Sequence, residues 1–226
     1  MFARLATVIL LPLLLASCVL APGKFTSVLT INADRSFAFS YVGEVYGEDG
    51  EQSSSSMASD KSDKPSPAEI AKKKADADTK NRALAAALSK EAGYKRVTYL
   101  GAGKFLIDYA ASGTLNHAFL WPYNLDAEVL VPFVAVELRS GGVVRVKAAA
   151  FGNESAKSMT AMPMMPNIGE ALSNRLDGVF TLDTDAAIIS QNNEDGASEV
   201  AGRKIIVWKA TPQSSAAPTA VLRMAR

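Results

Sequence analysis

Few side chains in this 226-residue sequence have the chemistry of a catalytic group. His117 is its one imidazole, and no Gly-x-Ser-x-Gly motif occurs among the serines, so a hydrolase nucleophile and base are not indicated. Asp183-x-Asp185 and Glu194-Asp195 are two carboxylate pairs. Carboxylate oxygens suit calcium, but this spacing differs from the Asp-x-Asn-x-Asp-Gly loop, and a hairpin turn explains the second pair more simply. We therefore predict no enzyme, no cofactor and no metal site.

Four methionine thioethers form a second group of side chains that could bind a metal ion or a ligand. They are Met159, Met162, Met164 and Met165. Thioether sulfur is a soft ligand that selects Cu(I), which makes a copper site one interpretation of this spacing. The other interpretation is that flexible methionine side chains fill an irregular apolar gap or form the rim of a ligand site. We favour the second.

An aromatic-rich segment at 114–126 contains Trp121 and Tyr123. Together with the methionine segment it is able either to cover the core or to line a pocket for an acyl chain or another hydrophobic ligand. We favour core cover. Trp121, Tyr123 and the four methionines are nevertheless the candidate ligand-facing residues.

Composition limits the function classes that remain. The chain has 24 Lys and Arg against 23 Asp and Glu, and 48% of its residues are hydrophobic. This is the composition of a globular domain, and the near-zero net charge excludes a nucleic-acid partner on electrostatic grounds. One cysteine excludes an intramolecular disulfide framework.

That cysteine, Cys18, follows a short apolar segment. Arg4 precedes an apolar run at 5–15, which is shorter than the roughly 20 residues of a membrane-spanning helix and typical of a secretory signal. The sequence Leu15-Ala16-Ser17-Cys18 resembles the lipobox of bacterial lipoproteins. The resemblance implies that Cys18 becomes the mature N-terminus, with a diacylglyceryl group on its thiol and a further acyl chain, such as palmitate, on its amine.

This resemblance implies a domain organisation and a location. Residues 1–17 form the signal peptide, 18–24 a lipidated tether, and 25–226 a single periplasmic domain. Val19, rather than Asp, follows Cys18. In lipoproteins this indicates the outer membrane, with the protein on its periplasmic side. The tether would reach about 20 Å, at about 3.4 Å per residue, so we expect the domain to lie close to the leaflet.

Periodicity predicts an α+β fold. Strands at 25–32 and 36–46 form a hairpin, and the serine-rich segment 47–65 has the composition of a mobile loop. A helix begins at the Ser66 cap and continues to about Glu91. Further strands are predicted at 95–100, 104–110, 129–139, 143–151, 179–184, 186–190, 204–209 and 219–224, and a short second helix at 168–176. We expect a mostly antiparallel, meander-like sheet with the long helix packed on one face.

The first half of this helix contains Lys72-Lys73-Lys74 among acidic residues. We interpret it as a solvated face. Contact of the lysines with anionic lipid headgroups is the alternative.

The C-terminal part carries a second resemblance. The pattern Gly178-Val179-Phe180-Thr181-Leu182-Asp183-Thr184-Asp185, the turn at 192–196, Trp208 and Pro218 resemble the tail of uncharacterised bacterial lipoproteins. They are also loosely similar to LppM-type lipoprotein domains. Residues 22–27 resemble the same group. The resemblance implies a fold and a location, and no reaction.

These observations together predict a non-enzymatic, membrane-anchored lipoprotein of the bacterial envelope. Its expected role is periplasmic binding or envelope organisation, with the membrane as one partner through Cys18 and an envelope protein or lipid as the other. A carrier of a hydrophobic ligand such as a lipid is the alternative, followed by a methionine-rich copper-binding lipoprotein.

Overall fold

The computed structural model of the protein describes residues 20–47, 49, 66–124, 129, 131–152 and 174–225. Its strands are β1 (Ala21–Ile31), β2 (Ser36–Tyr46), β3 (Tyr94–Gly101), β4 (Lys104–Thr114), β5 (Ala118–Trp121), β6 (Val134–Arg139), β7 (Val143–Lys147), β8 (Asp177–Thr184), β9 (Ala187–Gln191), β10 (Ser198–Val200), β11 (Arg203–Ala210) and β12 (Thr219–Arg223). The long helix is α2 (Pro67–Leu88), and short 3-10 turns lie at Ser140–Gly142 and Ala149–Phe151.

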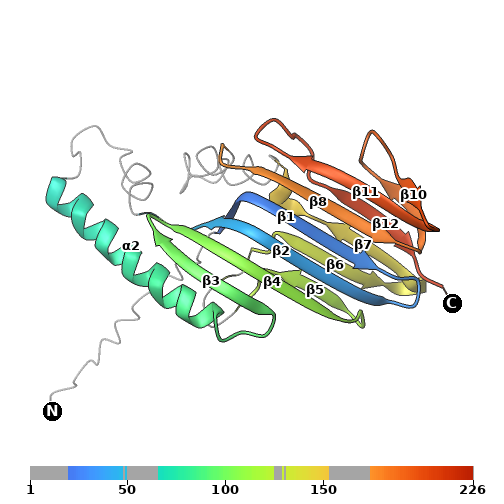
Figure 1. Ribbon diagram of the computed structural model, residues 1–226, viewed down its shortest axis with the longest axis horizontal. Coiled ribbons are helices and arrows are strands. Elements are labelled where there is room, and N and C mark those ends of the chain that lie inside the picture. The colour runs from blue at the N-terminus through green and yellow to red at the C-terminus, as the bar shows by residue number, and fades with distance from the viewer. Residues whose placement is uncertain are drawn as a thin grey trace, which may run out of the picture.

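The strands form two sheets. The larger has seven strands in the order β10-β11-β8-β1-β2-β4-β3, and the smaller has five in the order β5-β6-β7-β12-β9. The β1–β8 ladder is parallel, and the other ladders between the described strands are antiparallel. The smaller sheet lies behind the larger one in Figure 1, and one hydrophobic cluster joins residues of both.

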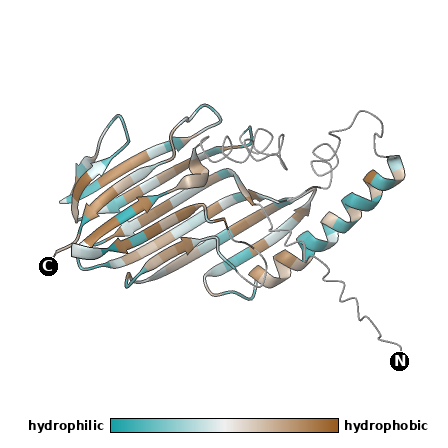
Figure 2. Cartoon of the chain, turned by 180° about the vertical axis from the view of Figure 1, so that it is seen from behind, coloured by the Kyte–Doolittle hydropathy of each residue, from teal (hydrophilic) through white to brown (hydrophobic). Residues whose placement is uncertain are grey.

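Alternation of side chains explains why these segments form strands. Along β2, Phe39, Tyr41 and Val45 are buried while Ala38 and Val42 are exposed. Successive side chains of a strand point to opposite faces, so one face of β2 faces the core. Figure 2 shows the same alternation of hydrophobic and hydrophilic residues on many of the strands.

The helix α2 covers the part of the large sheet next to β3. Ser66 and Glu69 form a capping box at its start, with the Ser66 amide donating to Glu69 Oε2 at 2.7 Å. Its buried residues Ala77, Asn81, Leu84 and Leu88 are three or four positions apart and form one face. Figure 2 shows that the half of α2 near its start is the more hydrophilic one. The helix therefore packs through its second half and middle and leaves its first turns exposed.

The α+β class, the dominance of antiparallel pairing and the packing of the long helix on a sheet confirm the prediction. The division of the strands into two sheets was not predicted. β1 begins at Ala21, four residues before the expected start, and Leu20 is already buried at 6% exposure. The interval predicted as tether is therefore largely part of the folded body. The loop predicted at 47–65 lies outside the described residues except for residues 47 and 49. Residues 168–173 of the predicted short helix also lie outside them, and residues 174–176 are described and are not helical.

Candidate functional site

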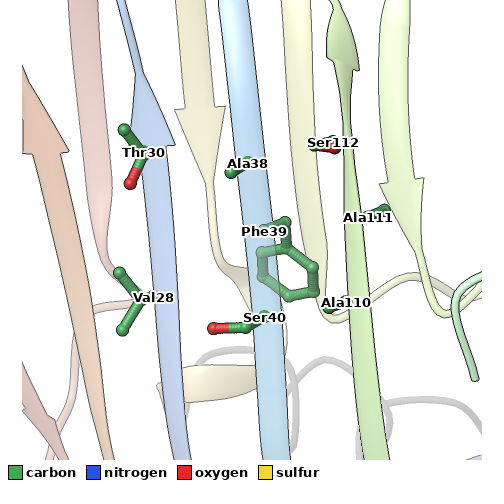
Figure 3. A pocket seen from close by; sticks show the side chains of 8 residues that line it. All are labelled: Val28, Thr30, Ala38, Phe39, Ser40, Ala110, Ala111 and Ser112. Atoms are coloured by element: carbon green, nitrogen blue, oxygen red, sulfur yellow. The ribbon is translucent and has the colours of Figure 1, made fainter. Parts of the chain in front are cut away.

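The face of the seven-stranded sheet that points away from the smaller sheet is the candidate binding surface, and we call it the outer face. It consists of the side chains that alternate with the buried ones on β1, β2, β4, β8 and β11. It has a shallow hollow of about 280 Å³ across β1, β2 and β4, nearer the turn between β1 and β2 than the start of β1 (Figure 3). The hollow is lined by Val28, Thr30, Ala38, Phe39, Ser40, Ala110, Ala111 and Ser112.

Strand register places an uncharged row across the outer face. The paired residues run from β11 to β4 in the order Val207, Thr181, Val28, Ser40 and Ala110. All five side chains are small or β-branched, so none of them protrudes far from the sheet. The row forms a smooth band that crosses five strands.

Large apolar side chains on the outer face are open to solvent. Val42 is 55% exposed, Val207 44% and Leu106 38%. Single exposed apolar residues are normal on a protein surface, but a contiguous group of them is typical of an interaction site. Here Val207 belongs to the uncharged row and Val42 borders it on β2, while Asp108, the register partner of Val42 on β4, is a charged neighbour.

Ion pairs lie at the margins of this band. Arg203 Nε and Asp183 Oδ1 are 2.6 Å apart at one margin, and Lys104 Nζ and Glu44 Oε1 are 2.7 Å apart at the other. Burial raises the pKa of Glu44, but hydrogen bonds from Lys104 and Tyr46 outweigh it and lower the pKa overall. The two charges within each pair neutralise each other. Asp108 on β4 and Lys209 on β11 are further charged residues of the outer face, and they have opposite signs.

The smaller sheet presents a different surface to solvent. Arg139, Arg145, Lys147 and Arg223 are exposed on β6, β7 and β12, and Arg139 forms an ion pair with Glu137. Arg145 pairs in register with Glu137 and lies between β6 and β12. The smaller sheet also exposes Leu120 at 37% and Ile189 at 47%. The two exposed sheet faces differ in that basic side chains lie on the central strand of the smaller sheet, whereas an uncharged row crosses the outer face. The outer face is therefore the candidate for docking.

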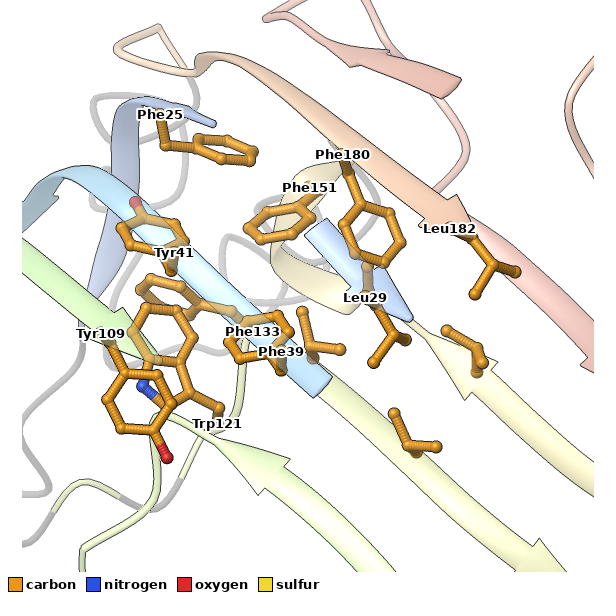
Figure 4. Close-up of a cluster of buried hydrophobic side chains, with 14 of the residues drawn as sticks. Phe25, Leu29, Phe39, Tyr41, Tyr109, Trp121, Phe133, Phe151, Phe180 and Leu182 are labelled. Carbon is orange, nitrogen blue, oxygen red and sulfur yellow. The ribbon is translucent and has the colours of Figure 1, made fainter. Parts of the chain in front are cut away.

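Trp121, a predicted ligand-facing residue, lies between the two sheets. It is 2% exposed, and its ring centroid lies 4.5 Å from that of Tyr41, 5.3 Å from those of Phe39 and Tyr109, and 5.5 Å from that of Phe133 (Figure 4). Side chains of the protein therefore fill the space around it. This placement favours core cover over a ligand-facing role for Trp121.

The phenol groups of this aromatic cluster are uncharged at physiological pH. Burial raises the pKa of Tyr41 and of Tyr109, so both phenols stay neutral at physiological pH. The Tyr41 hydroxyl donates to the Glu44 carbonyl at 2.8 Å. Trp121 Nε1 has no hydrogen-bond partner within the described part of the chain. The cluster has the properties of a packed core and lacks an ionisable group poised for catalysis.

The remaining predicted residues are placed as follows. Tyr123 is 46% exposed and follows the cis peptide bond between Trp121 and Pro122. Cys18 and the four methionines lie outside the described residues, so their roles stay predictions.

The residues considered for catalysis or metal binding do not converge. His117 is exposed, and its backbone carbonyl accepts from the Leu138 amide at 2.7 Å. Asp183 is paired with Arg203, and Asp185 accepts from the Ala33 amide at 2.6 Å. Among the residues with described positions, no three His, Cys, Asp or Glu side chains are arranged to hold a metal ion. In that same part of the chain, no helix is both long and apolar enough to cross a membrane.

The outer face was not identified from the sequence. A signal was present, since Ala38, Ser40 and Val42 alternate with the buried aromatic residues of β2 and are not the charged side chains expected on a solvated face. One strand alone does not show whether its neighbours continue the pattern. The long-range pairing of β1 with β8 and of β8 with β11 shows which strands lie beside β1 and continue the uncharged row.

Comparisons with known proteins add a distant structural likeness. No protein-family model and no curated protein matches the chain. Among solved structures, the folded domain of the Mycobacterium tuberculosis protein LppM, determined by NMR, is similar with a TM-score of 0.41 and 13% sequence identity. The match covers 91% of this chain and 92% of that domain. Function is therefore inferred from the residues of this chain.

Proposed function

We propose that this chain is a non-enzymatic lipoprotein, anchored by Cys18 in the outer membrane on its periplasmic side, whose domain binds another envelope protein through the outer face. The observation that carries the binding role is the uncharged row from Val207 to Ala110, which contains the exposed Val207 and is bordered by the exposed Val42. The anchor rests on the lipobox that ends at Cys18.

The shape of the outer face supports a protein partner. A ligand pocket usually encloses about 300–1,000 Å³ and buries most of its ligand. The hollow of about 280 Å³ is below that range and is floored by short side chains such as Ala38 and Ser40. A flat apolar band suits another protein surface better than it suits an enclosed small molecule.

A hydrophobic ligand such as a lipid is the second candidate. An acyl chain lying along the hollow between Val28 and Ala110 is the arrangement that the described surface supports for it. The methionine-rich copper hypothesis depends on residues outside the described part of the chain and stays a prediction.

Photo-crosslinking in intact cells tests the binding role. A photoreactive amino acid at Val42 reports on the outer face, and the same amino acid at Arg145 reports on the exposed face of the smaller sheet as a matched control. We expect a discrete protein adduct from position 42 and none from position 145. The adduct should disappear when Val207→Glu is added on the same face. Equal adducts from both positions, or an adduct insensitive to Val207→Glu, would contradict the proposal.

The same photo-crosslinking experiment distinguishes lipid binding from protein binding. If the outer face binds a lipid, the label at position 42 should give a small mass increase and no protein adduct. Intact-mass measurement of the purified protein separates these two outcomes.

A further inference from the structure

We propose that one end of the domain, which we call the membrane-facing end, lies directly against the headgroup layer of the leaflet that holds the anchor. It consists of Leu20 at the start of β1, Tyr46, the turn from Leu100 to Lys104 between β3 and β4, Arg175, and the first half of α2. The inference rests on the proposed lipidation of Cys18 and goes beyond it, because it fixes which surface faces the lipid.

The length of chain before the folded body carries the inference. Only Val19 separates Cys18 from Leu20, which is 6% exposed and belongs to the hydrophobic cluster. Two residue steps span at most about 7 Å when fully extended. A lipidated Cys18 therefore holds the start of β1 within about 7 Å of its own position at the leaflet. The end of the domain that contains Leu20 is therefore the end held nearest the lipid.

Register and contacts place the other segments at this end. Ala21 pairs with Tyr46, and Tyr46 pairs with Lys104. The Gly47 amide donates to the Gly103 carbonyl at 2.7 Å. In Figure 1 the start of β1, the tip of the β3–β4 hairpin and α2 lie together at the left.

The first half of α2 approaches the same turn. Lys74 and Ala102 line one hollow of about 420 Å³ together with Tyr99. Lys72 precedes Lys74 on the helix and is exposed. The lysine-containing half of α2 is therefore positioned beside the turn, at the level of the headgroups.

The side chains at this end have the composition of a membrane interface. Lys104 Nζ lies 5.8 Å and Arg175 Cζ 4.4 Å from the centre of the Tyr46 ring. Tyrosine, lysine and arginine are the residues that proteins place at headgroup depth. Leu100, 54% exposed, adds an apolar side chain beside the turn.

Acidic residues balance much of the positive charge. Lys104 is paired with Glu44, and Arg175 Nη2 lies 3.9 Å from Asp49 Oδ2. The contact therefore depends on the anchor and on the Tyr46 and Leu100 side chains, and it does not require a strongly anionic membrane.

Fluorescence quenching on vesicles tests the orientation. Cys18 is the one cysteine of the chain, and its thiol is consumed by lipidation, so an introduced cysteine is the single reactive thiol. Ala102→Cys places an environment-sensitive dye at the β3–β4 turn. Ser140→Cys places it at an exposed turn between β6 and β7 as the control.

Ser140 lies at the opposite end of the sheets. Nearby, the Met224 amide donates to the Gly142 carbonyl, and the Ala225 amide donates to the Ala33 carbonyl in the turn after β1. The eleven residues of β1 separate that turn from Leu20 by roughly 36 Å, at about 3.3 Å per residue.

The full-length lipidated variants are reconstituted in vesicles of phosphatidylethanolamine and phosphatidylglycerol that carry a headgroup nitroxide. We expect the dye at position 102 to lose most of its fluorescence and the dye at position 140 to lose none. Equal quenching at the two positions, or stronger quenching at 140, overturns the proposed orientation. Leu100→Cys is the second reporter of this end if Ala102→Cys does not fold.

Mass analysis of the N-terminal peptide from the same preparation separates the two proposals. A lipidated Cys18 with equal quenching defeats the orientation alone. An unlipidated Cys18 defeats the anchor, and the orientation falls with it.

Discussion

At the residue scale, Trp121 contributes most through the packing of its ring. It contacts Phe39 and Tyr41 of the larger sheet and Phe133, which directly precedes β6, and it is 2% exposed. We predict that Trp121→Ala lowers the free energy of unfolding by about 3–5 kcal/mol, because it removes buried apolar area and leaves a cavity. Tyr123→Ala, at a residue that is 46% exposed, should change it by no more than about 0.5 kcal/mol. Urea unfolding of both variants measures this, and equal losses would refute the core role of Trp121.

Glu44 provides a pH-dependent contribution at the same scale. Burial raises its pKa, but hydrogen bonds from Lys104 and Tyr46 prevail and lower the pKa below its ordinary value. A carboxyl with a lowered folded-state pKa stabilises the fold above its unfolded-state pKa. That contribution is lost as the pH falls through the folded-state pKa.

We therefore predict that Glu44→Gln destabilises the protein at pH 7 and makes little difference at strongly acidic pH. Chemical unfolding at the two pH values gives the comparison. Glu199→Gln, on an exposed residue of β10, is the control and should leave the pH dependence unchanged. If Glu44→Gln lowers the free energy of unfolding equally at both pH values, the loss of the Glu44–Lys104 ion pair is not its cause.

At the element scale, Gly43 allows an irregular pairing between β1 and β2. The register shifts between Pro22 and Phe25, so β1 carries one extra residue opposite β2. A Cβ atom on Gly43 would lie 2.4 Å from the Lys24 carbonyl oxygen and 2.6 Å from Phe25 Cα. Both are backbone atoms, and the strand would have to shift to accommodate a side chain.

We predict that Gly43→Ala lowers the free energy of unfolding by roughly 1–3 kcal/mol, as overpacked substitutions do. Gly113→Ala is the matched control on β4, because its Cβ would meet only the Phe37 ring at 3.6 Å. Thermal or chemical unfolding distinguishes the two. Equal stability of the variants would mean that the bulge does not depend on glycine.

The elements themselves were largely predictable, because local patterns encode them. The alternation in 36–46 and the Ser66–Glu69 cap predicted β2 and the start of α2. Four strands of the second sheet were predictable, but β5 and the separation of the second sheet from the first were not, because that separation depends on pairing between distant strands such as β7 and β12. Trp121 of β5 packs against Tyr41 and Phe133, which lie outside this strand and are not indicated by its local pattern. The outer face was not predictable either, because it depends on the parallel β1–β8 ladder between distant segments.

At the scale of the whole molecule, the anchor and the outer face are geometrically compatible. With the proposed anchor at Cys18, β1 would run away from the leaflet, and the outer face would point sideways rather than into it. A surface in this orientation is open to another protein held in the same membrane. The membrane-facing end and the outer face are separate surfaces, and substitutions on one should leave the other functional.

The anchor and the membrane-facing end both depend on lipidation at Cys18, so the most direct test is mass spectrometry of the N-terminal peptide of the protein purified from bacterial membranes. We predict a peptide that begins at Cys18 and carries a diacylglyceryl group on its thiol and an acyl chain on its amine. In the same cells, Cys18→Ala should lose membrane association. A mature N-terminus elsewhere in the chain, or an unmodified Cys18 on a protein that still sediments with membranes, would contradict the lipid anchor.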